Sequence, residues 1–280
     1  DLKKKKVRKS KVKEEGHEKY FNRIDSDVFD ENTLEHELSK FESDAAQVFQ
    51  NIIKTKSLPS TPADWGIFLY YIALLGVRNP AIRESLDETK SHLMKVSLEL
   101  LLSDSNVWEN YKSKFDDNEI PDIKKMSLFE AREKLLKYEL RSLTPPGEFS
   151  RIEFPTVDKV TESLSRRKWT LLDASSCPYD FITSDRPVKL FWSNGLNDLG
   201  WGPGFGMQNS DLFFPLSKKI YLIGRFESPF PHMAANEKLV STINTMQIYY
   251  TNRFLYGPND FFYFDDNSND NVKSTKYFKA

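Results

Sequence analysis

The chain has 280 residues, with 40 Lys and Arg against 41 Asp and Glu, so its formal net charge is −1. This balance excludes a uniformly basic nucleic-acid coat and an acidic solvating tail. Aromatic residues make up 14% of the chain, and so many large rings can bury a core, which excludes wholesale disorder. The one cysteine, Cys177, excludes an internal disulfide, and the four histidines share no zinc-finger spacing.

The first 31 residues are predicted to form a basic N-terminal arm or hairpin. The segment from Lys3 to Lys13 reads KKKKVRKSKVK, with eight Lys or Arg in eleven positions. One interpretation is an arm that binds nucleic acid or another phosphate-bearing ligand, because clustered cations release counterions on binding. The alternative is a solvated ribbon, since no aromatic residues are interleaved to stack on bases. The chain begins inside a charged run, and we expect that an upstream segment is missing.

Residues 32–147 are predicted to be helical. Apolar residues from Leu34 to Ile53 recur in steps of three and four, which indicates one apolar helix face. Thr61 and Pro62 predict the start of a second helix, which ends near Arg78 because Asn79-Pro80 follows. Its apolar stretch is shorter than the ~20 residues of a membrane span, so it predicts a buried helix and no membrane partner. No apolar signal segment follows the basic arm, so a cytoplasmic location is expected.

Three further helices are expected before the chain changes character. The first runs from about Ala81 to Ser103, with Leu86, Leu93, Leu100 and their neighbours as its apolar stripe. A shorter helix is expected from about Val107 to Phe115. Ser127 and Glu130 match a capping box for a third, which runs to about Leu143. The segment Thr144-Pro145-Pro146-Gly147 predicts a break.

Residues 148–258 are predicted to form the sheet part, and residues 259–280 a flexible tail. Aromatic and branched residues predict strands at Lys168–Asp173, Tyr179–Thr183, Val188–Trp192, Asp211–Leu216, Ile220–Gly224 and Arg253–Tyr256. One helix is expected at about Glu237 to Tyr250. The predicted fold class is α+β, with a helical first half packed on a small, mostly antiparallel sheet in one compact unit.

Polar residues at three places are candidates for chemistry. Glu35 and Glu42 are seven residues apart, so they share one side of a helix and could bind a divalent metal or share a proton. The alternative is a solvated flank with ordinary Glu–Lys pairing. Arg78 ends an almost wholly apolar helix, where it needs the helix carbonyls, a carboxylate or a substrate anion as its partner.

The segment Thr183–Pro187 lies between two predicted strands. It is either a plain turn or the place where Asp185 presents a carboxylate to a cleft. Ser184 lacks the Gly-x-Ser-x-Gly elbow of a hydrolase nucleophile. The run GWGPGFG from Gly200 matches no phosphate-binding loop and indicates an irregular loop or a lid.

Several segments together resemble one family, the domain of unknown function 4238, over nearly the whole chain. They are LEHELSKFESDAAQVF, GVRNPAIRE, FITSDRPVKL, FFPLSKKIYLI and INTMQIYYTNRFLYG. The family's recurring features match at Glu35 and Glu42, Arg78 with Pro80, Thr183-Ser184-Asp185 with Pro187, Phe214–Ser217, Asn244 and Arg253. The family opens with a His-Tyr-Val-Pro-like segment that is absent here. The resemblance implies a fold plan and candidate residues but no established activity.

These residues support two hypotheses. In the first, Glu42 and Asp185 bind a divalent metal or act as acid and base in the hydrolysis of a phosphodiester or other anionic substrate. Arg78 then neutralises the substrate and Asn244 orients it, while Glu35, Ser184 and Arg253 help to bind it. In the second, the chain is a non-catalytic binding or sensing module, and the same residues form a structural polar network.

Overall fold

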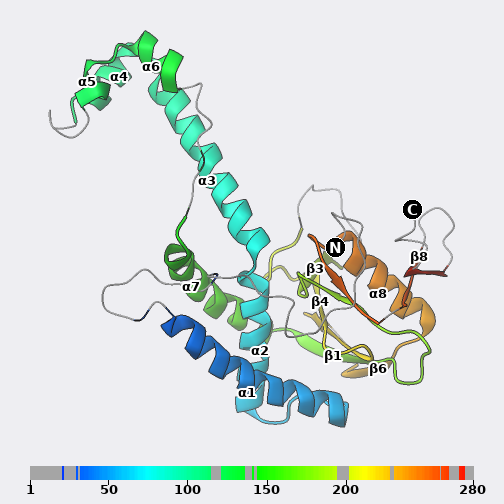
Figure 1. The fold of residues 1–280 in the computed structure, drawn as a ribbon. Coiled ribbons are helices and arrows are strands. Elements are labelled where there is room, and N and C mark those ends of the chain that lie inside the picture. Colours follow the sequence, from blue (N-terminus) through cyan, green and yellow to red (C-terminus); the bar gives the residue numbers. More distant parts are fainter. Residues whose placement is uncertain are drawn as a thin grey trace. The chain divides into compact units, whose positions relative to one another are not determined.

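The computed structural model describes residues 21, 30, 32–114, 121–135, 141, 144–193, 202–227, 230–258, 260–264 and 271–274. Internal packing divides the chain into two compact units, one of residues 1–79 with 146–280 and the other of residues 80–145. The proposed basic arm at residues 3–13 lies outside the described residues. Most helices belong to the first half and most strands to the second, which confirms the predicted α+β class (Figure 1).

Three long helices belong to the first unit. They are α1 (Thr33–Thr55), α2 (Pro62–Val77) and α7 (Pro146–Ser165). Helix α1 buries the face that its spacing predicted, which includes Ala45 and Ile52. The Thr61 side chain accepts a hydrogen bond from the Asp64 N–H at 3.1 Å and caps α2. None of the helices in the described part of the chain combines the length and the apolar composition that a membrane span needs.

The predicted break at residues 144–147 is present at Thr144 and Pro145, which belong to no helix. Helix α7, which follows directly, was not predicted from the sequence. Pro146 occupies its first position, where a backbone N–H has no partner within the helix and proline is therefore tolerated. The helix packs against α2 and buries Val157, Val160 and Leu164 in the same core as α1 and α2. A segment from the middle of the chain thus joins the first two helices.

A five-stranded sheet forms the body of the first unit, with strand order β3-β4-β5-β1-β6. The strands are β1 (Lys168–Asp173), β3 (Lys189–Trp192), β4 (Ser210–Pro215), β5 (Ile220–Arg225) and β6 (His232–Ala234). Neighbours run antiparallel, except that β1 and β6 are parallel. The strand predicted at 179–183 is reduced to β2 (Thr183–Ser184), which pairs separately with β7 (Leu255–Tyr256).

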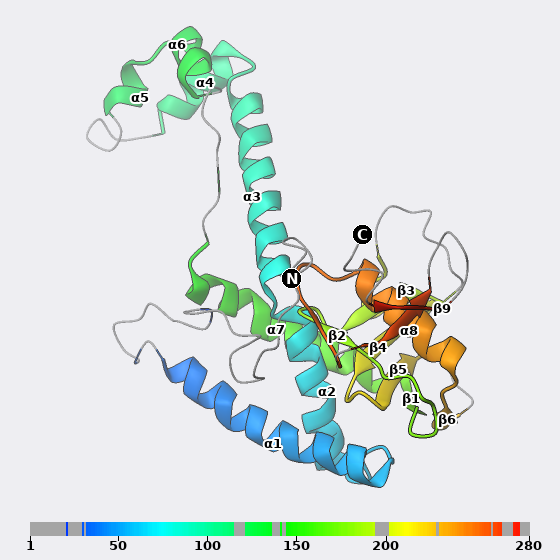
Figure 2. The same ribbon diagram turned by 45° about the vertical axis from the view of Figure 1, so that its right-hand side comes forward.

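Side chains alternate between the two faces of this sheet, as the two-residue period of a strand requires. Leu171, Phe214 and Leu222 pack in the core formed with α1, α2 and α7. Leu172 and Tyr221 point to the other face, where they pack with Val240 of α8 (Glu237–Tyr249). The first unit is therefore a three-layered arrangement of helices, sheet and helix, which Figure 2 shows from the side.

The described part of the glycine-rich segment packs against α2 and does not form an open lid. Phe205 joins the helical core. A Cβ atom at Gly76 would lie 2.8 Å from Cζ of Phe205, which is closer than such atoms approach in folded proteins. Gly76 therefore lets the ring of Phe205 approach the helix backbone.

The segment predicted as a flexible tail contains an antiparallel strand pair, β8 (Phe262–Phe264) with β9 (Asn271–Lys273). Phe261 and Tyr263 are buried with Ile182 and Ile248, so aromatic burial holds this pair to the first unit. The strands are too short to give a clear alternating pattern in the sequence.

The second unit consists of helices in its described part. They are α3 (Pro80–Leu101), α4 (Ser105–Lys112), α5 (Pro121–Lys125) and α6 (Leu128–Leu135). Its small core contains Leu102, Trp108 and Ala131. The predicted capping box forms at the start of α6, since Glu130 accepts a hydrogen bond from the Ser127 N–H at 2.9 Å. The predicted apolar stripe of α3 is not buried, because Leu93 and Leu100 are 59% and 65% exposed.

Candidate functional site

Arg78 forms a buried ion pair with a residue that the sequence did not indicate. It follows the last turn of α2, and its Nε atom donates to Glu153 Oε2 of α7 at 2.9 Å. The two side chains are only 4% and 2% exposed. The guanidinium also lies over the Phe154 ring, 4.8 Å from the ring centre. The sequence left helix carbonyls, a carboxylate or a substrate anion as possible partners of Arg78, and the structure places a carboxylate there.

Glu35 and Glu42 lie on α1 and belong to the same group. Burial and the nearby Glu35 carboxylate raise the pKa of Glu42, and Arg78 opposes this shift. Burial and Glu42 raise the pKa of the Tyr71 phenol on α2. Glu35, Glu42, Tyr71, Arg78 and Glu153 are called the helical cluster below. The structure thus brings together three of the candidate residues, from α1 and α2.

The helical cluster offers few ligands for a metal ion. Within the part of the chain that the structure describes, no three His, Cys, Asp or Glu side chains are placed to hold a metal together. His36, His92 and His232 are exposed. The candidate cofactor was a divalent metal at Glu42. Glu35 is a nearby carboxylate for it, but no third ligand of these types completes the group among the described residues.

The carboxylate of Asp185 accepts hydrogen bonds from three backbone N–H groups. Its Oδ2 atom accepts hydrogen bonds from the N–H groups of Arg253 at 2.7 Å and Phe254 at 3.0 Å. Its Oδ1 atom accepts one from the Asn252 N–H at 3.2 Å. A carboxylate that accepts several N–H bonds fixes the turn that presents them. Asp185 therefore anchors the segment after α8 to the end of β2.

Asn244 is fully buried in α8 and uses both ends of its amide. Its Oδ1 atom accepts from the Ile182 N–H at 3.1 Å. Its Nδ2 atom donates to the carbonyls of Asp180 at 2.9 Å and Phe262 at 2.8 Å. Asn244 thus joins α8 to the segment before β2 and to β8.

Ser184 belongs to the same region. Its hydroxyl lies 2.9 Å from the Arg186 carbonyl and 3.1 Å from Oε1 of Gln247. Gln247 in turn donates to the Tyr221 hydroxyl at 2.6 Å, and burial raises the pKa of that phenol. Ser184, Asp185, Asn244, Gln247 and Tyr221 are called the α8 network below. Nothing in the sequence indicated Gln247 or Tyr221.

Two cations lie at the end of the α8 network. Lys189 is buried and donates to the Tyr250 carbonyl at the end of α8. Burial lowers the pKa of Lys189 to about 7, Arg186 adds to the shift, and Asp185 opposes it. Arg253 holds its guanidinium 4.6 Å from the centre of the Phe254 ring, while its N–H binds Asp185.

The family follows from a comparison of the whole chain. A family model described as "Protein of unknown function (DUF4238)" matches residues 1–261. The chain belongs to the DUF4238 family. No match was found among curated proteins or among solved structures.

In this DUF4238 chain, the contacts of the candidate residues divide them into two groups. Glu35, Glu42 and Arg78 belong to the helical cluster. Ser184, Asp185 and Asn244 belong to the α8 network, and Arg253 is tied to it through its N–H. The carboxylate of Asp185 binds the turn after α8, whereas Arg78 pairs with Glu153. The predicted set of Glu42, Arg78 and Asp185 is therefore not joined by these contacts.

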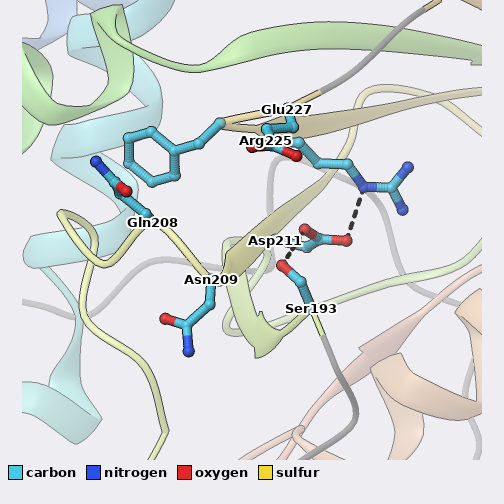
Figure 3. Close-up of a pocket in the computed structure, with 7 residues that line it drawn as sticks. Ser193, Gln208, Asn209, Asp211, Arg225 and Glu227 are labelled. Atoms are coloured by element: carbon cyan, nitrogen blue, oxygen red, sulfur yellow. Dashed lines mark hydrogen bonds and ion pairs between the residues drawn. The ribbon is translucent and has the colours of Figure 1, made fainter.

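The DUF4238 chain also has a polar pocket that the sequence did not indicate. It has a volume of about 510 Å³ and is lined by Ser193, Gln208, Asn209, Asp211, Arg225, Phe226 and Glu227 (Figure 3). Leu212 pairs with Gly224 across β4 and β5, so Asp211 and Arg225 are the next pair along the two strands. The opposite charges of Asp211 and Arg225, at the ends of two predicted strands, could have indicated this site, but only if the register of the two strands had been known.

Proposed function

We propose that this DUF4238 chain is a non-catalytic binding module, in which the family's polar residues form a structural network. The observation that carries the proposal is the engagement of Asp185. Both of its oxygens accept backbone hydrogen bonds from residues 252–254. A metal or a catalytic proton at this carboxylate would compete with those N–H groups for the same lone pairs. This favours a structural role for Asp185 over the metal-binding or acid–base role.

The ion pair between Arg78 and Glu153 supports the same proposal. A substrate anion at Arg78 would have to reach a side chain that is 4% exposed and already paired. Moving Arg78 away from Glu153 would leave a buried carboxylate without its cation, which costs about 3–5 kcal/mol. This favours a structural role for Arg78.

A binding module needs a ligand, and the ligand proposed for this chain is anionic or bears a phosphate group. The basic arm at residues 3–13 stays a second proposed contact for nucleic acid. A cytoplasmic location is part of the same proposal.

The test compares stability with hydrolysis in the purified chain. Asp185→Asn keeps one acceptor oxygen but loses the charge, so we expect a loss of about 1–2 kcal/mol in unfolding free energy. We expect that the purified chain has no activity on DNA, RNA or nucleotides, with Mg²⁺ or Mn²⁺ present, that depends on Asp185. Hydrolysis lost in Asp185→Asn at an unchanged melting temperature would reject the proposal.

A hydrolase that uses Glu42 is the second candidate function. The raised pKa of Glu42, next to Glu35, is the observation that favours it, because a general acid must hold its proton near the working pH. For such an enzyme, Glu42→Gln should abolish metal-dependent hydrolysis of a phosphodiester without lowering the melting temperature. Equal activity in Glu42→Gln and the parent chain would exclude Glu42 as the acid or base.

A further inference from the structure

Arg225 is held in a fixed orientation at the wall of the polar pocket. Its Nε atom donates to Asp211 Oδ2 at 2.7 Å, and Asp211 Oδ1 accepts from the Ser193 hydroxyl at 2.6 Å (Figure 3). The Arg225 side chain is 36% exposed. Its two terminal nitrogens donate no hydrogen bond to any residue that the structure describes. A guanidinium whose Nε is occupied keeps a planar pair of donors for a second oxyanion.

A second guanidinium lies behind this wall. Arg167 is buried, and its terminal nitrogens donate to the carbonyls of Phe205, Ser210 and Gly224 and to the Ser210 hydroxyl. Its Nε atom has no hydrogen-bond partner among the described residues. Burial lowers the pKa of Arg167 to about 10, so it stays charged at neutral pH, and Asp211 opposes the shift. Asp211 thus lies near two guanidiniums, so these three groups sum to one positive charge before Glu227 is counted.

The other walls offer polar groups and one aromatic ring. The side-chain amides of Gln208 and Asn209 are exposed and form no hydrogen bond to the described residues. Phe226 has Arg167 over one face of its ring, 4.5 Å from the ring centre. Glu227 is exposed at the pocket, where its carboxylate opposes the charge of Arg225. These groups suit a small ligand with one oxyanion and a polar body.

We propose that this pocket binds a small molecule through a phosphate or carboxylate group. Two oxygens of that group accept from the terminal nitrogens of Arg225, and Gln208 and Asn209 bind the polar body of the ligand. The volume of about 510 Å³ lies in the usual range for small-molecule sites. The inference rests on the proposed binding function and names its ligand class and its site.

The experiment titrates the full chain with inorganic phosphate, acetate and adenosine monophosphate at low salt, by calorimetry. The three probes distinguish a tetrahedral from a planar oxyanion and show whether a polar body adds affinity. Arg225→Gln should weaken binding by about tenfold or more, because it removes a charged two-point contact. Arg225→Lys keeps the charge but not the paired donors, so its affinity should lie between those of the parent and Arg225→Gln.

Three variants separate the pocket from general effects of charge and folding. Arg166→Gln makes the same charge change at an exposed position of the chain and should leave binding unchanged. Glu227→Gln should raise the affinity several-fold, because it removes a negative charge next to the oxyanion. The double variant Gln208→Ala with Asn209→Ala should weaken binding of adenosine monophosphate without disturbing the pair of Asp211 and Arg225. It tests the site even if Arg225→Gln fails to fold.

Two results would overturn the pocket assignment. One is binding that Arg225→Gln and Arg166→Gln reduce equally, which would leave a binding function standing and move its site elsewhere. The other is the absence of binding for all three probes. Neither result bears on Asp185, whose structural role is tested by melting and hydrolysis, so failure of the pocket and failure of the proposed function are distinguishable.

Discussion

The helical cluster and the α8 network both contain candidate residues from the sequence, but they satisfy polar groups in different ways. In the helical cluster a charge meets a charge, as Arg78 meets Glu153. In the α8 network, side chains bind backbone groups, as Asn244 and Asp185 do. A buried charge pair fails when one member is removed, because the other is left uncompensated. A backbone network fails in proportion to the hydrogen bonds that are lost. The two regions should therefore respond differently to substitution.

The largest expected effect is at Glu153. Glu153→Ala leaves the Arg78 guanidinium buried without this carboxylate, so the unfolding free energy should fall by about 3–5 kcal/mol. Urea denaturation measures it. Glu162→Ala is the matched control on α7, since its pair with Arg166 is exposed and should contribute little. Replacing Arg78 by Met and Glu153 by Leu together should recover most of the loss. A double variant as unstable as Glu153→Ala would contradict the charge-pair explanation.

Asn244→Ala is expected to cost slightly less, about 3 kcal/mol. It leaves the Ile182 N–H and the carbonyls of Asp180 and Phe262 without their amide partner in a buried site. Thr242→Ala is the control on the same helix, because its hydroxyl is exposed and binds a carbonyl within α8. Equal stability of the two variants would show that water replaces the amide and that the α8 network does not hold the fold.

The sequence predicted those parts of the fold that have a strong local signal. Helix α1 repeats apolar residues in steps of three and four, and strands β1, β4 and β5 are rich in aromatic and branched residues, so their positions followed from the sequence alone. Helix α7 could not be predicted in this way. Proline is found both at the start of helices and just after their ends, and the residues around Pro146 indicate a break. Strands β6, β8 and β9 have three residues each, too few to alternate visibly.

The candidate residues could be found from the sequence, but their partners could not. Arg78 after an apolar helix signalled a need for a counter-charge, yet Glu153 lies 75 residues away on a helix that was not predicted. Asp185 in a turn was consistent with both a turn and a site, and the N–H groups that decide between them come from residues 252–254. Tertiary contacts of this kind leave no local trace in one sequence.

A substitution at Lys189 tests whether a buried charge at the end of the α8 network lowers the stability of the fold. Because its pKa is lowered to about 7, the unfolded chain binds more protons than the folded one up to about pH 10.5. Stability should therefore rise with pH between these values, by at most about 1.4 kcal/mol per unit. Lys189→Met should lose that slope in denaturation measured from pH 7 to 10, whereas the exposed Lys218→Met should keep it. Parallel slopes in the parent chain and Lys189→Met would remove Lys189 as the cause.

The smallest expected effect, at Glu42, separates the exposed edge of the helical cluster from its buried pair. The raised pKa of Glu42 means that the folded chain holds this proton more tightly than the unfolded chain in the pH window above 4.5. Stability therefore falls as pH rises through that window. Glu42→Gln cannot ionise, so it should match the parent chain near pH 4 and exceed it at pH 7 by about 0.5 kcal/mol or less, since the carboxylate is only partly buried and solvent screens its charge. Glu37→Gln on the same helix removes a carboxylate that is paired with Lys40 and should give no such gain.

A Glu42→Gln variant that is less stable than the parent at pH 7 would mean that attraction to Arg78 outweighs burial and repulsion from Glu35. The whole helical cluster would then be held together by charge pairing.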